Sequence, residues 1–411
     1  MKILAVGAGG VGSSIATIAS SRDFYDGFIV ADIDLERAQR IIDRIDDPRF
    51  EATAIDASRP TNIAQAAAAL GCDTVINAAD PRYVVPIFDG AFDAGATYID
   101  MAMSISTAHP GRPYEACGLK LGELQFNEAH AWEQAGRLAI VGMGVEPGFS
   151  DVAARYAADE LFSEIHEIGV RDGANLVVRN YAFAPTFSVW TVIEECLNPP
   201  VIWERDRGWF TTEPFSEPEV FTFPEGIGPV ECVNVEHEEV MLIPRWINCD
   251  RVTFKYGLGD EFIEVLKVIR KLGLDSTESR AIGGGNVSPR DFIASHLPDP
   301  STLGDQIDGK TCAGTWVKGL DKQGQPAEKY VYHVVDNADT MGRHGSQAVL
   351  WQTAINPVIA LELVANGLWS GAGVLGPEAF PPIPFLDTLA KEYNSPWGID
   401  HQPRRTVATN P

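Results

Sequence analysis

The chain of 411 residues has little positive charge, few cysteines and no obvious ligand set for a metal. It carries 32 Lys and Arg against 57 Asp and Glu, and the resulting net charge of −25 argues against nucleic acid or an anionic membrane as a partner. The six cysteines are scattered without a C-x-x-C motif, which indicates reduced thiols and no disulfide framework. The eight histidines include no pair at helical i, i+4 spacing, so no metal site is predicted.

The sequence also lacks a secretion signal, internal repeats and any apolar run that approaches a membrane span. We therefore expect a cytoplasmic protein without a membrane-spanning segment. The composition is 45% hydrophobic, which is ample for a buried core, and the length predicts two domains, one of which can be discontinuous.

A glycine-rich turn close to the N-terminus is the most informative pattern. The apolar run Lys2–Val6 leads directly into the sequence GAGGVG at residues 7–12, and an alanine-rich helical segment, Ser13–Ser21, follows. A second apolar run, Phe28–Ala31, then ends in Asp32. Strand, G-x-G-x-x-G, helix, strand and acid in this order are typical of a dinucleotide-binding site.

Each glycine of this motif has its own physical role. Gly7 allows the tight turn, Gly9 lets the backbone approach a pyrophosphate, and Gly12 lets the helix pack closely on the strand. Gly10 and Val11 begin the helix, whose free N–H groups attract the phosphates.

The choice of cofactor depends on Asp32, whose carboxylate can accept both ribose hydroxyls and repels a 2′-phosphate. We therefore expect NAD to be preferred, with NADP possible because Arg37 is close in sequence. Two further strands supply candidate cofactor contacts: one ends at Asp56, and the other, Thr74–Asn77, leads into Ala78 and Ala79. Small residues at this point let a nicotinamide lie close to the sheet.

The alternation of strands and helices continues to residue 141 and then gives way to β-rich segments. The predicted fold is α/β: a Rossmann doubly wound parallel sheet at residues 1–145, completed by C-terminal helices at 346–390. Residues 146–345 are predicted to form an α+β domain with a largely antiparallel sheet, for substrate binding. Ser104–Gln125 breaks the pattern and is either a lid over the site or a surface insertion.

Several motifs in the second half resemble the saccharopine dehydrogenase-like family, and the likeness covers nearly the whole chain. The loop GVEPG at 144–148 is similar to that family's G-L-D-P-G, with Glu146 in place of the aspartate. Further similar motifs are VEHEE at 235–239, KTCAG at 310–314, QAVLWQT at 347–353 and GVLGPEAF at 373–380. The saccharopine dehydrogenase and carboxynorspermidine synthase branches are the most similar.

This resemblance implies an NAD(P)-dependent oxidoreductase that transfers a hydride at the CH–NH group of an amino-acid or amine substrate. It also implies a homodimer. Two alternatives stay open: oxidative deamination of lysine at its terminal amine, and a catalytically idle NAD-binding redox sensor.

The proposed chemistry needs a carboxylate near an iminium nitrogen and a group that donates or accepts a proton. The candidates are Glu146, on the loop where the two domains meet, Asp100, at the end of the fifth strand, and His237. Asp151 is a further candidate, although capping of the next helix explains it equally well.

Substrate-binding candidates are of two kinds. Glu238 and Glu239 form an acidic cluster with His237 that is suited to an amino group, or else they mark a solvated strand end. Arg171, Arg245 and Lys255 are candidates for pairing with a substrate carboxylate, each with a structural ion pair as the alternative.

Overall fold

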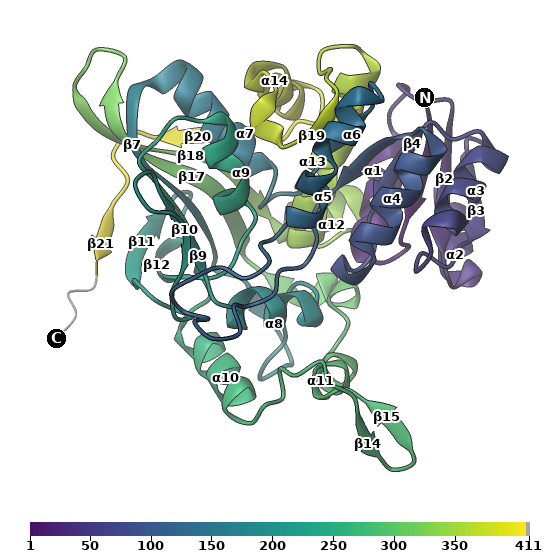
Figure 1. Ribbon diagram of the computed structural model, residues 1–411, viewed down its shortest axis with the longest axis horizontal. Helices are drawn as coiled ribbons and strands as arrows, with labels where there is room; N and C mark the ends of the chain where they lie inside the picture. Colours follow the sequence, from purple (N-terminus) through teal and green to yellow (C-terminus); the bar gives the residue numbers. More distant parts are fainter. Residues whose placement is uncertain (408–411) are drawn as a thin grey trace.

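The computed structural model describes residues 1–407, and it is built from two halves that are organised on different sheets. Figure 1 shows the parallel sheet and its helices on the right, in purple and blue, and the large curved sheet on the left. The last part of the chain, in yellow, lies against both halves.

The first half is a seven-stranded parallel sheet with the order β19-β6-β5-β4-β1-β2-β3. Because the strand order runs outward in both directions from the centre, the crevice beside β1 and β4 is where a doubly wound sheet binds its ligand. The predicted Rossmann fold is therefore confirmed. Its strands are β1 (Lys2–Val6), β2 (Gly27–Asp32), β3 (Phe50–Ala54), β4 (Thr74–Asn77), β5 (Thr97–Asp100), β6 (Leu138–Ile140) and β19 (Gly373–Leu375).

Local sequence explains where the covering helices begin and end. The side chain of Asp34 accepts the N–H groups of Glu36 and Arg37 and so caps α2, while Pro60 opens α3 at a position that needs no N–H donor. The helices of this half are α1 (Gly10–Ser20), α2 (Leu35–Ile45), α3 (Pro60–Leu70), α4 (Val84–Ala94), α5 (Glu123–Asn127) and α6 (Ala129–Gln134).

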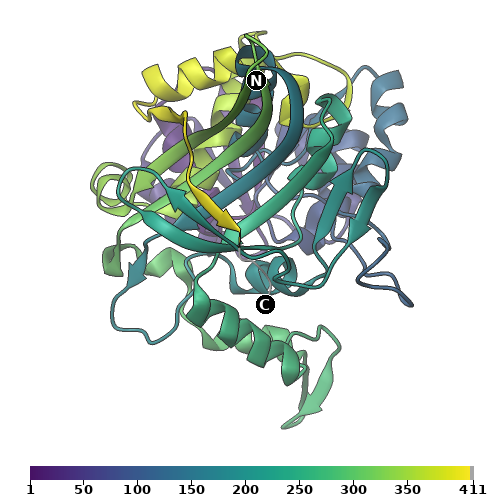
Figure 2. The same cartoon turned by 90° about the vertical axis from the view of Figure 1, so that its left-hand side faces the viewer.

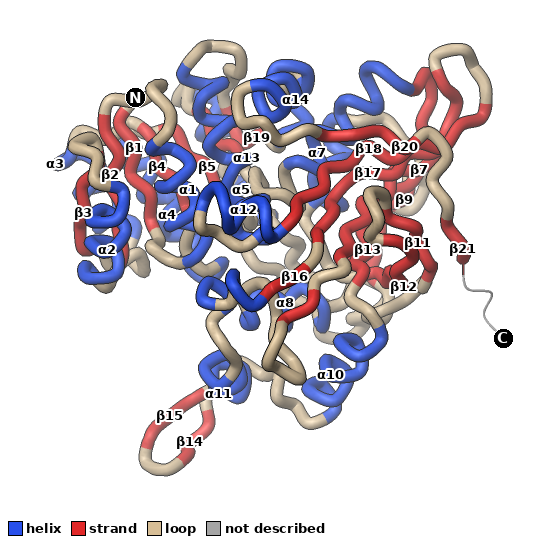
Figure 3. The backbone as a smooth tube through the Cα atoms, turned by 180° about the vertical axis from the view of Figure 1, so that it is seen from behind, coloured by secondary structure: helices blue, strands red, loops and turns tan. Residues whose placement is uncertain are grey.

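The C-terminal part of the chain returns to this first half. Strand β19 pairs in parallel with β6, and α13 (Ala348–Ala365) packs along α1. The Ser14 and Ser346 hydroxyls lie 2.7 Å apart, and the guanidinium of Arg22 donates to the Glu362 carboxylate at 3.0 Å. These contacts join the two ends of the sequence. Figure 3 shows α13 and β19 beside the N-terminal sheet from behind. The domain boundary between residues 145 and 146 stays a prediction.

Helix α13 departs from one expectation. By length and composition it could cross a membrane, although no such run was expected from the sequence. In the structure 78% of its 18-residue window is buried, as in the core helix of a globular fold.

The second half is a curved, mixed sheet whose strands are mostly antiparallel, as predicted (Figure 2). The exception is the parallel pair β7 and β13, in which Asp172 lies beside Tyr256. The strands of this sheet are β7 (Phe162–Ala174), β9 (Val201–Glu204), β10 (Gly208–Thr211), β11 (Glu219–Phe223), β12 (Gly228–Asn234), β13 (Arg251–Gly257), β17 (Lys310–Asp321), β18 (Pro326–Asp336), β20 (Trp397–Asp400) and β21 (Arg405–Val407).

Helices and short strands surround this sheet. The helices are α7 (Phe149–Tyr156), α8 (Val189–Leu197), α9 (Glu239–Trp246), α10 (Asp260–Lys271), α11 (Pro289–His296), α12 (Asn337–His344) and α14 (Pro382–Lys391). The short strands are β8 (Val177–Val178), β14 (Arg280–Ile282), β15 (Gly285–Val287) and β16 (Ile307–Asp308).

Three local features complete this half. The chain after Pro396 joins the sheet, because β20 pairs with β18 and β21 with β11. Strand β8 has two residues and pairs with β16. The glycine run at 283–285 turns a β-hairpin between β14 and β15. The backbone makes the pairings at the sheet edges, so side-chain patterns reveal them poorly.

The motif glycines differ in how tightly they are packed. A Cβ on Gly12 would lie 1.9 Å from the carbonyl oxygen of Gly7, and one on Gly7, whose φ is +112°, would lie 2.4 Å from the carbonyl oxygen of Ala78. A Cβ on Gly9 would meet nothing within 4 Å. Gly7 and Gly12 are thus required by the fold, whereas Gly9 leaves space beside the start of α1.

This contrast gives a matched pair of variants. We expect Gly12→Ala to lower the free energy of unfolding by about 2 kcal/mol, because its methyl group overlaps the Gly7 backbone. Gly9→Ala is expected to change it by less than about 0.5 kcal/mol, since the methyl group meets no atom, and yet to weaken cofactor binding. Chemical unfolding and dinucleotide titration of both variants test this; equal destabilisation by the two would contradict it.

Candidate active site

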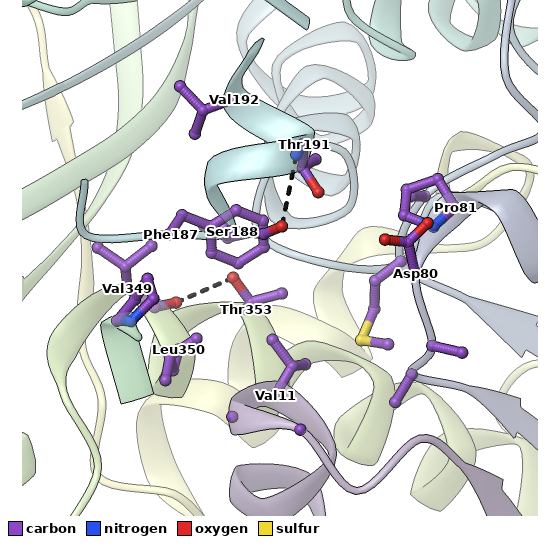
Figure 4. A pocket seen from close by; sticks show the side chains of 18 of the residues that line it. Val11, Asp80, Pro81, Phe187, Ser188, Thr191, Val192, Val349, Leu350 and Thr353 are labelled. Atoms are coloured by element: carbon purple, nitrogen blue, oxygen red, sulfur yellow. Dashed lines mark hydrogen bonds between the residues drawn. The ribbon is translucent and has the colours of Figure 1, made fainter. Parts of the chain in front are cut away.

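A cavity of about 400 Å³ lies between the two halves of the structure. Figure 4 shows side chains from α1, α13 and the start of α8 around it: Val11, then Val349, Leu350 and Thr353, then Phe187, Ser188 and Thr191. The predicted cofactor residues that line it are Gly9, Gly10, Val11, Asn77, Ala78 and Ala79. The glycine turn and the end of β4 therefore open into one space.

The two acids predicted to bind cofactor differ in position. Asp32 lies beside the glycine turn, where its carboxylate accepts the N–H of Ala8 at 2.8 Å and that of Asp34 at 3.0 Å. Asp56 lies beyond β3, is exposed, and accepts the N–H of Ser58 at 3.0 Å. Arg37 lines the cavity. Neither acid is among the residues that line it: Asp32 lies beside the glycine turn, and Asp56 lies beyond β3.

On the side of the mixed sheet, the cavity is lined by acidic and aromatic side chains. Glu146 comes from the loop before α7, Glu195 from α8, His237 and Glu238 from the segment before α9, and Tyr256 from β13. Within residues 1–407, the cationic side chains that line the cavity are those of His237 and the exposed Arg37.

His237 is held by carboxylates on one side and by an aromatic ring on another. Its Nδ1 lies 2.6 Å from Glu239 and 3.4 Å from Glu238, and its ring stacks on Phe254 with 3.8 Å between centroids. Burial alone would lower the pKa of the imidazole, but Glu239, Glu238 and Glu195 outweigh it and raise that pKa to about 10. The ring is therefore an imidazolium at neutral pH.

Glu146 and Asp172 form a buried pair of carboxyl groups. Burial, followed by the charge of Asp172, raises the pKa of Glu146 well above its ordinary value. Burial also raises the pKa of Asp172 to about 7, and its hydrogen bond with Glu146 opposes that rise. Since two adjacent carboxylates out of water cannot both be ionised cheaply, the pair shares a proton at neutral pH. Of the two acids, Glu146 lines the cavity, and its carboxyl group is the protonated one.

Further buried acids surround this pair. Burial raises the pKa of Glu195 to about 8, although His237 opposes the rise, and it raises that of Glu236 to about 7. Glu236 accepts hydrogen bonds from Ser106 at 2.8 Å and Asn198 at 2.9 Å. Glu238 accepts the N–H of Met103 at 3.1 Å, so the 104–125 segment and the residue before it hold part of the acidic cluster.

The cations predicted to bind a substrate carboxylate face elsewhere. Arg171 is 1% exposed and donates to Glu219 at 2.5 Å, and Lys255 donates to the same carboxylate at 3.0 Å. Although burial would raise the pKa of Glu219, the two cations lower it to about 2. Arg245 lies over the ring of Phe126 at 3.8 Å. None of the three lines the cavity. Arg171 and Lys255 are held in structural ion pairs with Glu219, which was the alternative for each, whereas Arg245 stacks on Phe126.

Strand periodicity explains this error and the residues that were missed. Successive side chains of a strand point to opposite faces, so Arg171 and Lys255 lie on one face while Asp172 and Tyr256, one residue further along, lie on the other. The sequence pattern pointed to the wrong neighbour on both strands. Glu195, the third cavity residue that was not predicted, belongs to no local sequence motif.

Asp100, predicted as catalytic, is buried and does not line the cavity. Its carboxylate accepts the Gly142 N–H at 2.7 Å, the Gln125 amide at 2.7 Å and the Tyr98 hydroxyl at 2.9 Å. Burial raises the pKa of Asp100 to about 7. With three donors on its oxygens, this carboxylate fixes the loop after β6, and the geometry does not favour a catalytic role.

Asp151 also lies outside the cavity. It accepts the N–H of Gly148 at 2.7 Å and so caps the first turn of α7. Burial and the neighbouring Glu378 raise the pKa of Asp151 well above its ordinary value. Glu239, too, is not exposed to the cavity; it accepts the Ser150 hydroxyl at 2.8 Å and orients His237.

Comparison with known proteins covers almost the whole chain. Residues 3–140 match the saccharopine dehydrogenase NADP binding domain, and residues 144–394 match the saccharopine dehydrogenase C-terminal domain. The carboxyaminopropylagmatine dehydrogenase of Synechocystis sp. is 28% identical over 399 residues, 96% of each chain. The carboxynorspermidine synthase of Vibrio cholerae is 28% identical over 95% of this chain and 94% of its own.

One solved structure shares the fold over the full length. The apo saccharopine dehydrogenase (L-Glu forming) from Saccharomyces cerevisiae superposes with a TM-score of 0.69 at 14% identity, covering 97% of this chain and 99% of its own. At this identity the likeness concerns the fold alone.

The buried Asp151 and Glu378 pair predicts a pH-dependent stability. Burial raises the pKa of Glu378 from 4.5 to about 7, so the folded protein holds a proton that the unfolded chain releases. The free energy of unfolding therefore falls as the pH rises through this window, by about 1.4 kcal/mol per unit of raised pKa. We expect Glu378→Gln, whose amide donates without a shared proton, to lose less Tm between about pH 5 and pH 8 than the unchanged protein.

The control is Glu264→Gln on α10, where the side chain is 69% exposed and pairs with Lys267. Thermal unfolding of the three proteins at matched ionic strength makes the comparison. Parallel Tm profiles for Glu378→Gln and the unchanged protein would rule out a proton shared at this position.

Proposed function

The chain belongs to the saccharopine dehydrogenase family, whose members are NAD(P)-dependent dehydrogenases acting on CH–NH groups, and from this premise we propose reductive coupling of a cationic amine. The amine condenses with a carbonyl compound, and the resulting imine is reduced to a secondary amine. The relatives named for agmatine and norspermidine, both cationic amines, support this choice.

The observation that carries the proposal is the excess of acid around the cavity. Glu146, Glu195 and Glu238 line it, while His237 is the one buried cation among its described lining residues. Burying carboxyl groups with too few counter-charges is costly unless they stay protonated or a cation binds. A substrate with one or more ammonium or guanidinium groups would supply the missing positive charge.

The residues on the cofactor side fit a dinucleotide, because the glycine turn is open at Gly9 and the small side chains of Ala78 and Ala79 leave the cavity free. When bound, the dihydronicotinamide would supply the hydride for the imine carbon. We further propose that NADH is preferred, since the Asp32 carboxylate beside the glycine turn repels a 2′-phosphate.

Glu146 is proposed as the group that protonates the imine nitrogen. Its raised pKa keeps a proton available at neutral pH. After the transfer both carboxyl groups are ionised, and the charge of His237, which lowers the pKa of Asp172, and the iminium cation stabilise them. Hydride addition to the protonated imine then gives a neutral secondary amine, and solvent restores the proton of the pair. The imidazolium of His237 is the cation available to a carboxylate on the carbonyl partner.

The first experiment measures NADH and NADPH oxidation with amines and oxo compounds, singly and in pairs. We expect consumption only when a diamine or guanidino amine and a carbonyl compound are both present, and faster with NADH. Reduction of NAD by a diamine alone, with release of ammonia, would instead support oxidative deamination. Tight NADH binding without turnover of any pair would support a non-catalytic sensor.

Glu146→Gln tests the proton donor. We expect kcat to fall by about 10²- to 10⁴-fold, the usual contribution of a positioned acid or base, with NADH affinity unchanged. The basic limb of the pH–rate profile should also disappear. Glu164→Gln, an exposed glutamate on β7, is the matched control. An unchanged kcat in Glu146→Gln, with the protein folded, would remove this residue from the mechanism.

A further inference from the structure

A second cavity, of about 510 Å³, adjoins the first. Phe187, Val192 and Tyr256 line both cavities, so the side chains of these three residues form the boundary between the two. The second cavity is bordered by residues 176–187, which lead into α8, and by residues 257–262, which lead from β13 into α10.

The walls of this second cavity are aromatic. Tyr181, Phe183, Phe187 and Phe262 line it, and the rings of Phe183 and Phe262 stack with 4.9 Å between centroids. Aromatic faces of this kind attract ammonium and guanidinium groups through the ring quadrupole.

The charges at this cavity are of one sign. Asp260 and Glu261 line it, and among its lining residues within 1–407 there is no Lys, Arg or His. Glu231 lies against Asp260, and burial, together with the hydrogen bond that protonated Glu231 donates to the Asp260 carboxylate, raises the pKa of Glu231. Crowded carboxyl groups next to aromatic rings are complementary to a cation and repel an anion.

We propose that the second cavity binds the far, positively charged arm of an extended amine whose reacting end lies near Glu146. The inference rests on the proposed function, and three features of the second cavity support it: the wall that it shares with the first, its aromatic lining and its acidic charge. An amine with a second cation would then reach both cavities, passing Tyr256, whereas a short amine would occupy only the first. Selectivity for the length of the amine follows from this arrangement.

The test compares binding of α,ω-diamines of increasing length to the NADH-loaded protein by calorimetry, in the unchanged protein and in Asp260→Asn/Glu261→Gln. We expect the double variant to weaken binding of the longest diamine about 10-fold, and the shortest by less than about 2-fold. Phe262→Leu should act in the same direction through loss of the ring. Glu264→Gln, on the same helix but outside the cavity, is the control and should leave both affinities unchanged.

The outcomes separate this inference from the proposed function. Equal loss of affinity for short and long diamines, or no loss for the longest, would overturn the second binding site even if turnover is intact. A protein that binds the long diamine through Asp260 and Glu261 but reduces no imine would keep the site and refute the reaction. In steady-state kinetics with the same amines, we expect the double variant to raise KM for the longest diamine and to leave kcat unchanged.

Discussion

The cost of burying carboxyl groups is the constraint on which the rest of this site depends. Glu146, Asp172, Glu195 and Glu238 are gathered around one imidazolium, and burial raises the pKa of each of these acids. Such a cluster is stable when protons are shared or when a cation enters. The shortage of positive charge makes the carboxyl cluster costly in the free protein. The same shortage makes the cluster suitable for a cationic substrate that must also receive a proton.

The fold provides this environment by bringing distant segments together. The loop after β6 supplies Glu146, β7 supplies Asp172, α8 supplies Glu195 and the segment before α9 supplies His237. On the opposite side of the cavity, α13 returns from the end of the chain to pack on α1 and so closes the wall beside the glycine turn. The cavity thus has a dinucleotide-binding wall and an acidic wall, built from different sheets.

The two faces of the mixed sheet carry charge in different ways. On one face Arg171 and Lys255 neutralise Glu219 in a buried ion cluster, whose cations hold the pKa of that carboxyl at about 2. On the other face Asp172 forms no ion pair within residues 1–407 and remains paired with Glu146, and the charge of His237 offsets the effect of burial on its pKa only in part. A fully compensated cluster is suited to hold strands together, whereas an under-compensated one is suited to bind and exchange protons.

The sequence by itself determined the parallel sheet, the glycine turn, the acid at Asp32 and the family, because these depend on local order: apolar runs, glycines at fixed spacing and motifs that need no knowledge of neighbours. It also pointed to Glu146, His237 and Glu238, which do line the cavity. Only the tertiary structure decided that Asp172, Glu195 and Tyr256 belong beside them and that Arg171 and Lys255 do not. The physical reason is that the register between strands selects which of two adjacent side chains faces the cavity, and a one-residue difference reverses that choice.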